Sequence, residues 1–106
     1  MLASMNRLVL AAQVVERGKM RYTPAGLPAL DMLLKAESEV SQNGQPRKVS
    51  IEIRAVVIGE ITKSAQALAL GSPALLAGFL ASSRNGKGLV FHVTEIAAEP
   101  AAPVTV

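Results

Sequence analysis

The stretch Gly78-Phe-Leu-Ala-Ser-Ser-Arg-Asn-Gly-Lys-Gly-Leu-Val-Phe-His-Val-Thr-Glu-Ile96 consists of two apolar runs joined by a short, glycine-rich polar link. Asn85 and Gly86 accept positive φ at little cost, so this pair predicts the turn of a β-hairpin. Arg84 and Lys87 place two positive charges at the hairpin tip. The tip is therefore a place where the protein could bind a polyanion.

The composition indicates one small domain with an aliphatic core. The chain has 106 residues, of which 50% are hydrophobic and only 3% aromatic, a size that fits a single domain. The chain has no cysteine, which excludes disulfides and thiolate metal sites. The net charge of +3 is a basic bias that is compatible with a nucleic acid partner without requiring one.

No segment has the pattern of a signal peptide or a membrane span. The first residues lack a charged region followed by an apolar stretch. A membrane-spanning helix needs about 20 predominantly apolar residues, and the most apolar segment, residues 65–81, is interrupted by Gln66, Gly71, Ser72, Pro73 and Gly78. We therefore expect a soluble, cytoplasmic protein with no membrane contact.

Alternating apolar and polar side chains predict five strands, over residues 6–16, 27–37, 49–59, 75–82 and 89–96. Both faces of the first strand are fairly apolar, as in a barrel strand or a strand at a subunit interface. One face of the second strand is expected to carry Leu30, Met32, Leu34 and Ala36. In the third strand the alternation gives way to an apolar run at residues 55–58, which a bulge or full burial would explain.

The segments between these strands are expected to be turns and loops. Residues 17–26 form a basic turn region, and residues 38–48 are expected to be a mobile polar loop because they have almost nothing to bury. Residues 60–70 fit a short helix and an extended chain equally well. We expect residues 1–5 to be a flexible extension, residues 6–98 the domain, and residues 99–106 a disordered tail.

Five strands with few helical signals predict a small closed barrel, because closure removes the exposed edges of an open sheet. The five-stranded barrel that binds oligomers is the OB-fold, which uses the face of strands 2 and 3 and the loops between strands 1 and 2 and between strands 4 and 5. Basic residues gather in those loops and in the third strand. The predicted fold is an all-β, five-stranded OB-fold barrel with extended loop hairpins.

Candidate DNA-binding residues follow from the chemistry of nucleic acids, in which phosphates attract Lys and Arg and bases stack on aromatic rings. Tyr22, within the basic turn region, is the expected stacking residue, whereas Phe79 and Phe91 lie in strand interiors and are expected in the core. Each candidate cation would otherwise be an ordinary solvated surface charge. The candidates are Lys19, Arg21, Arg47, Lys48, Arg54, Arg84 and Lys87.

Catalysis and metal binding lack the residues that they need. His92 is the single histidine and Asp31 the single aspartate, so neither a metal centre nor a catalytic triad has enough partners. His92 alternates with Phe91 and Val93 and is expected to point away from the apolar face. We predict no enzymatic activity and no cofactor or metal.

Two groups of motifs resemble the family of primosomal replication protein N (PriB). The first is Asn6-Arg-Leu-Val-Leu with Thr23-Pro-Ala-Gly-Leu-Pro, which is fairly specific. The second is Leu70-Gly-Ser, Gly78-Phe-Leu, Asn85-Gly-Lys-Gly and His92-Val-Thr-Glu-Ile, parts of which ordinary single-stranded DNA-binding proteins share. The resemblance extends over residues 6–99.

The resemblance implies a homodimer of the bacterial cytoplasm that binds single-stranded DNA, the PriA helicase and other primosome proteins when stalled replication forks restart. Better-known members have a tryptophan in place of Ser50, a basic residue in place of Glu37, and more lysines in the loop between strands 4 and 5. These departures keep open an alternative, a protein-interaction OB module that chiefly docks a replication partner and binds DNA only weakly. A general strand-coating protein is a third possibility, but its usual acidic-tipped tail is reduced here to Glu99.

Overall fold

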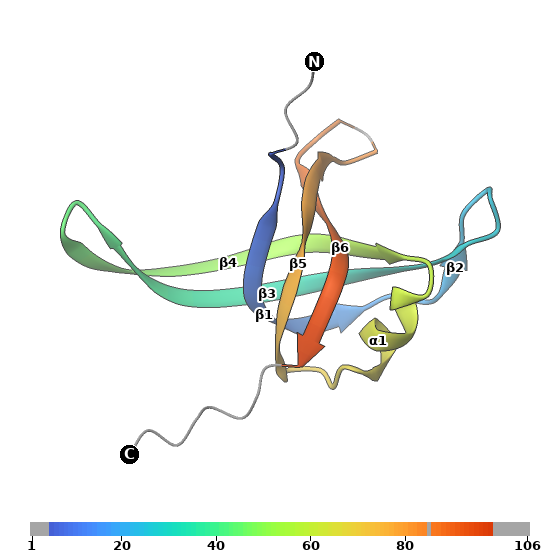
Figure 1. The fold of residues 1–106 in the computed structure, drawn as a ribbon, viewed down its shortest axis with the longest axis horizontal. Helices are drawn as coiled ribbons and strands as arrows, with labels where there is room; N and C mark the ends of the chain where they lie inside the picture. The colour runs from blue at the N-terminus through green and yellow to red at the C-terminus, as the bar shows by residue number, and fades with distance from the viewer. Residues whose placement is uncertain (1–4, 85, 99–106) are drawn as a thin grey trace.

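The computed structural model describes residues 5–84 and 86–98. These residues form mainly β-strands, with one short helix (Figure 1). In chain order the elements are β1 (Leu8–Arg17), β2 (Arg21–Tyr22), β3 (Pro28–Gln42), β4 (Gln45–Ile58), α1 (Ile61–Ala67), β5 (Pro73–Ser82) and β6 (Leu89–Ala98).

The strands close into a barrel, as predicted. They follow the order β1-β5-β6-β4-β3, and β1 pairs again with β3 to complete the ring, while the two-residue β2 adds to the edge of β3. β4 and β6 are parallel, with Ala55 opposite Phe91 and Val56 opposite His92; the other pairings within the described residues are antiparallel. The five-stranded barrel of the sequence prediction is therefore confirmed.

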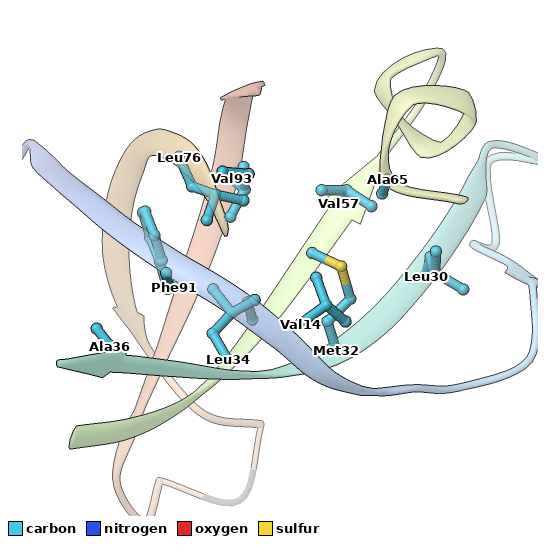
Figure 2. Close-up of a cluster of buried hydrophobic side chains, with 13 residues drawn as sticks. Val14, Leu30, Met32, Leu34, Ala36, Val57, Ala65, Leu76, Phe91 and Val93 are labelled. Carbon is cyan, nitrogen blue, oxygen red and sulfur yellow. The ribbon is translucent and has the colours of Figure 1, made fainter. Parts of the chain in front are cut away.

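The core lies inside the barrel and is built almost entirely from aliphatic side chains (Figure 2). Phe91 is fully buried, which confirms its predicted place in the core. The predicted inner face of the second strand is also confirmed, because every member of it is buried. Its residues are Leu30, Met32, Leu34 and Ala36.

The segment that fitted helix and extended chain equally well is partly helical. Gly59 leaves β4 with φ 95°, and Thr62 Oγ donates a hydrogen bond of 2.8 Å to the Gly59 carbonyl in the first turn of α1. Ala65 is fully buried in the barrel core. Arg17 donates to the carbonyl of Ala65 at 3.2 Å and to that of Leu68 at 2.6 Å, so it satisfies acceptors that a helix C-terminus leaves open.

The predicted mobile loop over residues 38–48 is wrong. β3 continues to Gln42 and β4 begins at Gln45, so most of this segment is a two-stranded ribbon that projects from the barrel (Figure 1). Asn43 and Gly44 have φ values of 53° and 75°, as a two-residue hairpin turn of type I′ requires. The segment has little to bury, but its backbone groups pair across the ladder. We call residues 37–50 the ribbon.

The apolar run at residues 55–58 reflects burial rather than a bulge. The β3–β4 register is continuous from Ala29 opposite Ile58 to Gln42 opposite Gln45. Val57 is fully buried, and Val56 is only 6% exposed although it alternates with Val57 and so belongs to the outer face. On that face it lies between two neighbouring strands, opposite Asp31 on β3 and His92 on β6.

The prediction that Phe79 belongs to the core is wrong. Phe79 lies on the outer face of β5 and is 39% exposed. Its ring stacks on that of His92 in β6, with centroids 4.9 Å apart and planes within 5°. His92 itself points away from the core, as predicted, since Phe91 and Val93 on either side are buried. Phe79 therefore shields its ring by stacking against a neighbouring strand instead of entering the barrel.

Gly78, beside this stacked pair, occupies a point of close backbone approach. A Cβ atom at this position would overlap the carbonyl of His92. The hairpin tip itself follows the prediction, because residues 83–88 link β5 to β6 and Gly86 and Gly88 both have positive φ. Asn85 lies outside the described residues, as do the predicted extension over residues 1–4 and the predicted tail over residues 99–106.

Across the described ranges, no helix combines the length and apolarity needed to cross a membrane.

Candidate nucleic-acid interface

A groove crosses the outer face of the barrel between the two basic loops, with a cavity volume of about 380 Å³. The groove begins beside β2, crosses the sheet formed by β3, β4 and β6, and ends at the link between β5 and β6. We call this surface the groove. Its lining residues are Arg21, Thr23, Pro24, Asp31, Val56, Ile58, Ser82, Arg84, Val90 and His92.

The groove combines an apolar floor with basic sides. Ile58 on β4, which is 41% exposed, and the half-buried Val90 on β6 contribute aliphatic surface, whereas Val56 is only 6% exposed. Arg21 contributes positive charge from β2, and Arg84 contributes it from the β5–β6 link. Aliphatic surface can contact base faces, and guanidinium groups can bind phosphates. The arrangement is therefore chemically suited to a strand whose bases are exposed.

Asp31 places a carboxylate in this otherwise basic groove. Arg21 Nε donates to Asp31 Oδ2 at 2.9 Å and Arg21 Nη2 donates to Asp31 Oδ1 at 3.1 Å. These hydrogen bonds lower the pKa of Asp31 and raise that of Arg21, and the charge of Arg54 lowers the Asp31 pKa further. Both members of the pair are about half exposed. Part of the positive charge of Arg21 is thus already neutralised.

The barrel brings several of the predicted DNA-binding residues together. Arg21 and Arg84, from the two predicted loops, line the same groove. Arg54 lines an adjoining hollow that shares Asp31 with the groove. Tyr22, next to Arg21, is 69% exposed, as stacking on a base requires. The two remaining candidates near the groove, Lys19 and Lys87, are also exposed, and they lie two and three residues along the chain from Arg21 and Arg84.

A model of a family described as "Another single-strand binding protein family" matches residues 6–95. The replication restart protein PriB of Bordetella pertussis is 49% identical over 81 residues, which cover 76% of each chain. The chain belongs to the PriB family of single-strand binding proteins. The resemblance on which the sequence prediction depended is therefore confirmed.

Further relatives agree with this assignment. The replication restart protein PriB of Neisseria gonorrhoeae is 42% identical over 76 residues, or 72% of this chain and 75% of its own length. A solved structure of PriB from Ralstonia solanacearum superposes with a TM-score of 0.83 at 36% identity, over 91% of this chain and 99% of the other. A small single-stranded DNA-binding protein from Streptomyces coelicolor, 14% identical with a TM-score of 0.69, shows the same OB-fold.

Two predicted DNA-binding residues lie far from the groove of this PriB-family protein. Arg47 and Lys48 belong to the ribbon, which projects from one side of the barrel while β2 and its turn project from the other (Figure 1). Arg47 donates to Gln42 Oε1 at 2.6 Å, and Lys48 lies opposite Glu39 in the ladder. The structure therefore does not bring these cations to the groove.

Two of the three positions at which the sequence analysis noted a departure from better-known PriB-family members meet at one place in the structure. Ser50 and Glu37 are direct cross-strand partners where the ribbon leaves the barrel. Both line a shallow hollow on the ribbon, together with Glu39 and Lys48. The two positions thus belong to one continuous patch, in which Glu37 and Glu39 outnumber the single cation Lys48.

Sequence reasoning missed Asp31 and His92 as parts of the groove, and it missed the stacking of Phe79 on His92. A signal for Asp31 was present, because period-two alternation from the buried Leu30 and Met32 places it on the outer face of β3. No comparable signal existed for Val56, since a residue in an apolar run gives no indication of its face. The groove depends on strands that lie far apart in the chain.

Among residues 5–84 and 86–98, no group of three His, Cys, Asp or Glu side chains could hold a metal ion.

Proposed function

We propose that this PriB-family protein binds single-stranded DNA in the groove and serves as a primosome accessory protein in replication restart, where it stimulates the PriA helicase in the bacterial cytoplasm. The observation that carries the proposal is the meeting of Arg21 and Arg84 across an apolar floor on the outer face of an OB-fold barrel. Membership of a single-strand binding family supports it. The role is one of binding and involves no catalysis.

The groove favours single strands over duplexes for a physical reason. The aliphatic floor offers its contact energy only to a base whose face is exposed, and in a duplex those faces are stacked inside the helix. In the proposed complex the bases lie over Ile58 and Val90, and the phosphates follow Arg21 and Arg84. Tyr22 stacks on a base at the β2 end, while further phosphates contact the other candidate cations: Lys19, Arg54 and Lys87.

DNA binding of this kind is expected to be modest and strongly dependent on salt. Arg21 is paired with Asp31 before DNA arrives, and Tyr22 is the one aromatic residue proposed to stack. Most of the attraction is then electrostatic, and salt weakens it as counterions compete for the phosphates.

The experiment that tests this is fluorescence anisotropy with labelled single- and double-stranded oligonucleotides of equal length, over a series of salt concentrations. We expect tighter binding of the single strand, with a negative slope of log affinity against log salt of about −0.7 for each phosphate contact. Equal binding of both forms would contradict the groove as the site. Absence of binding at low salt would contradict the DNA role.

Stimulation of the PriA helicase is a separate part of the proposal. It is supported by relatives named as replication restart proteins. The test is unwinding of a forked DNA substrate by PriA, with and without this protein. An unchanged unwinding rate at saturating protein would contradict the stimulation.

The second candidate function is that of an interaction module that chiefly docks a replication partner. The observation in its favour is the ribbon, where Glu37 and Glu39 offset Arg47 and Lys48. A nearly neutral projecting arm attracts a polyanion weakly and is better suited to a protein surface. Helicase stimulation that persists when the groove can no longer bind DNA would favour this function over the first.

We also propose that the protein is a homodimer. β1 pairs with β5 from Leu8 to Gln13 and with β3 from Gln13 onward, so within the described residues the first half of β1 has one open edge. Val9 and Leu75 expose apolar side chains on the outer face of these strands, at 51% and 44%. An open edge beside apolar surface favours pairing with a second copy. Sedimentation equilibrium giving the monomer mass at micromolar protein would contradict the dimer.

A further inference from the structure

Asp31 occupies a position in the groove that a purely electrostatic DNA site would not require. It is the one carboxylate among the described residues that line the groove. Arg21 donates two hydrogen bonds of 2.9 and 3.1 Å to it, which orient its carboxylate. A carboxylate in that place repels phosphates, and the DNA backbone would therefore keep to the sides of the groove.

The carboxylate retains capacity to accept further hydrogen bonds. An ionised carboxylate has about four lone-pair sites, and the contacts with Arg21 occupy two of them. The pKa of Asp31 is lowered by the Arg21 hydrogen bonds, in keeping with an ionised acceptor at neutral pH. The side chain is 57% exposed, so a ligand in the groove can reach it.

The floor of the groove places a base edge near this acceptor. Asp31 lies opposite Val56, so it is the diagonal cross-strand neighbour of Ile58, and the Cβ atoms of diagonal neighbours lie about 7–8 Å apart or slightly less. A base that lies with its face on Ile58, which is 41% exposed, would therefore direct an edge toward the Asp31 carboxylate. Hydrogen bonding at that edge depends on the identity of the base.

The four bases differ in what they offer to a carboxylate. Cytosine presents its N4 amino group as a donor, and aspartate or glutamate accepts from that group in known protein–DNA contacts. Thymine has a carbonyl on each side of its N3–H, and those two oxygens repel a carboxylate. A carboxylate in the groove thus distinguishes the two pyrimidines.

We propose that Asp31 reads bases in the groove and gives this protein a preference for cytosine over thymine in single-stranded DNA. The inference rests on the proposed function, because it requires DNA to lie in the groove. It differs from a purely structural role for the Arg21–Asp31 pair. If the pair only shaped the protein, its loss would change the affinity for every oligonucleotide by the same factor.

The experiment compares oligo(dC) and oligo(dT) of equal length by fluorescence anisotropy at low salt, for the wild type, Asp31→Asn and Glu37→Gln. The two variants make the same change in net charge, but Glu37 lies on the ribbon and does not line the groove. We expect the wild type to bind oligo(dC) about three- to tenfold more tightly than oligo(dT). Asp31→Asn should bring this ratio close to one, mainly by strengthening oligo(dT) binding, and Glu37→Gln should leave the ratio unchanged.

The outcomes separate this inference from the function on which it rests. If the wild type binds neither oligonucleotide, the proposed function itself fails. If it binds both but Asp31→Asn leaves the ratio unchanged, the DNA role stands and base reading by Asp31 is overturned. Circular dichroism establishes that each variant is folded, and Asp31→Ser, which also removes the carboxylate, replaces Asp31→Asn if the latter does not fold.

Discussion

The groove and the ribbon are both predicted from sequence to bind phosphates, but they are built in opposite ways. In the groove, Arg21 and Arg84 come from distant parts of the chain and face one apolar floor. In the ribbon, Arg47 and Lys48 are adjacent in sequence, yet Glu39 lies directly opposite Lys48. Adjacent basic residues therefore do not make a basic surface unless the neighbouring strand lacks opposing charge.

The two regions also differ in what stabilises them. The groove lies over the filled barrel, and its floor includes the nearly buried Val56. The ribbon extends beyond the core, and its apolar residue Val40 remains 43% exposed. A two-stranded ribbon with no packed face is marginally stable by itself, so the groove is the better preorganised of the two surfaces. The comparison can be tested by matched changes in both regions.

The largest difference is expected from charge reversal. Arg84→Glu with Lys87→Glu, at the end of the groove, should weaken single-stranded DNA binding by about a hundredfold at low salt and reduce the salt slope by about 1.4, the value for two phosphate contacts. Arg47→Glu with Lys48→Glu makes the same charge change on the ribbon and should have a much smaller effect. Anisotropy titrations across a salt series measure both.

Thermal unfolding serves as the control, since all four side chains are exposed and neither double variant should lose stability. Equal losses of affinity in the two double variants would show that the ribbon binds DNA as strongly as the groove. An unaltered affinity for the Arg84 and Lys87 double variant, with unaltered stability, would remove the hairpin tip from the site.

A smaller difference is expected from the exposed side chains that could contact bases. Tyr22→Ala should weaken single-stranded DNA binding by about tenfold, within the 1–3 kcal/mol range for loss of one base–aromatic stack, whereas Tyr22→Phe should bind nearly as well as the wild type. Val40→Ala on the ribbon is the matched change and should have no effect on affinity. Wild-type affinity in Tyr22→Ala would exclude stacking at this position.

The smallest difference is expected in stability, from the ion pairs of the two regions. Arg21 contacts Asp31 through two hydrogen bonds, whereas Lys35 lies 3.5 Å from Glu37 at the base of the ribbon. Both pairs are substantially exposed, so Asp31→Asn should lower the unfolding free energy at pH 7 by less than about 1 kcal/mol and Glu37→Gln by still less. Urea unfolding monitored by circular dichroism measures these changes.

The contribution of Asp31 to the unfolding free energy depends on pH in a definite direction. Because the folded protein lowers the pKa of Asp31, its contribution is present above the unfolded pKa of about 3.9 and is lost as the pH falls through the lower folded value. The difference in unfolding free energy between the wild type and Asp31→Asn should therefore shrink as the pH falls below about 4. A difference that grows on acidification would contradict the assignment of the ion pair.

Local signals predicted much of this fold. Period-two alternation placed Leu30 and Leu34 inside the barrel, and Asn85-Gly86 predicted the β5–β6 hairpin. The same signal at Asn43-Gly44 was overlooked in favour of polar composition, which led to the wrong prediction of a loop over residues 38–48. Composition reports what a segment can bury, whereas the backbone hydrogen bonds of a ribbon require no burial.

Other features were beyond local pattern. Phe79 is a large apolar residue of the kind usually found in a core, but it stacks on His92 outside the barrel. In the alternation of β5, position 79 faces outward whereas Leu76 faces inward. The alternation of Val56 is hidden within an apolar run, so its place in the groove floor follows only from the parallel pairing with His92.

By itself, the sequence determined the strands of the barrel, the core-facing residues of those strands, the family, and which basic side chains are available to bind a polyanion. These depend on side-chain periodicity, on turn residues and on motifs that can be read within a few positions. Only the tertiary structure decided that Arg21, Asp31 and Arg84 share one groove while Arg47 and Lys48 lie apart from it. The physical reason is barrel closure: the β1–β3 and β4–β6 pairings join residues that are far apart in the chain, and no local pattern encodes such contacts.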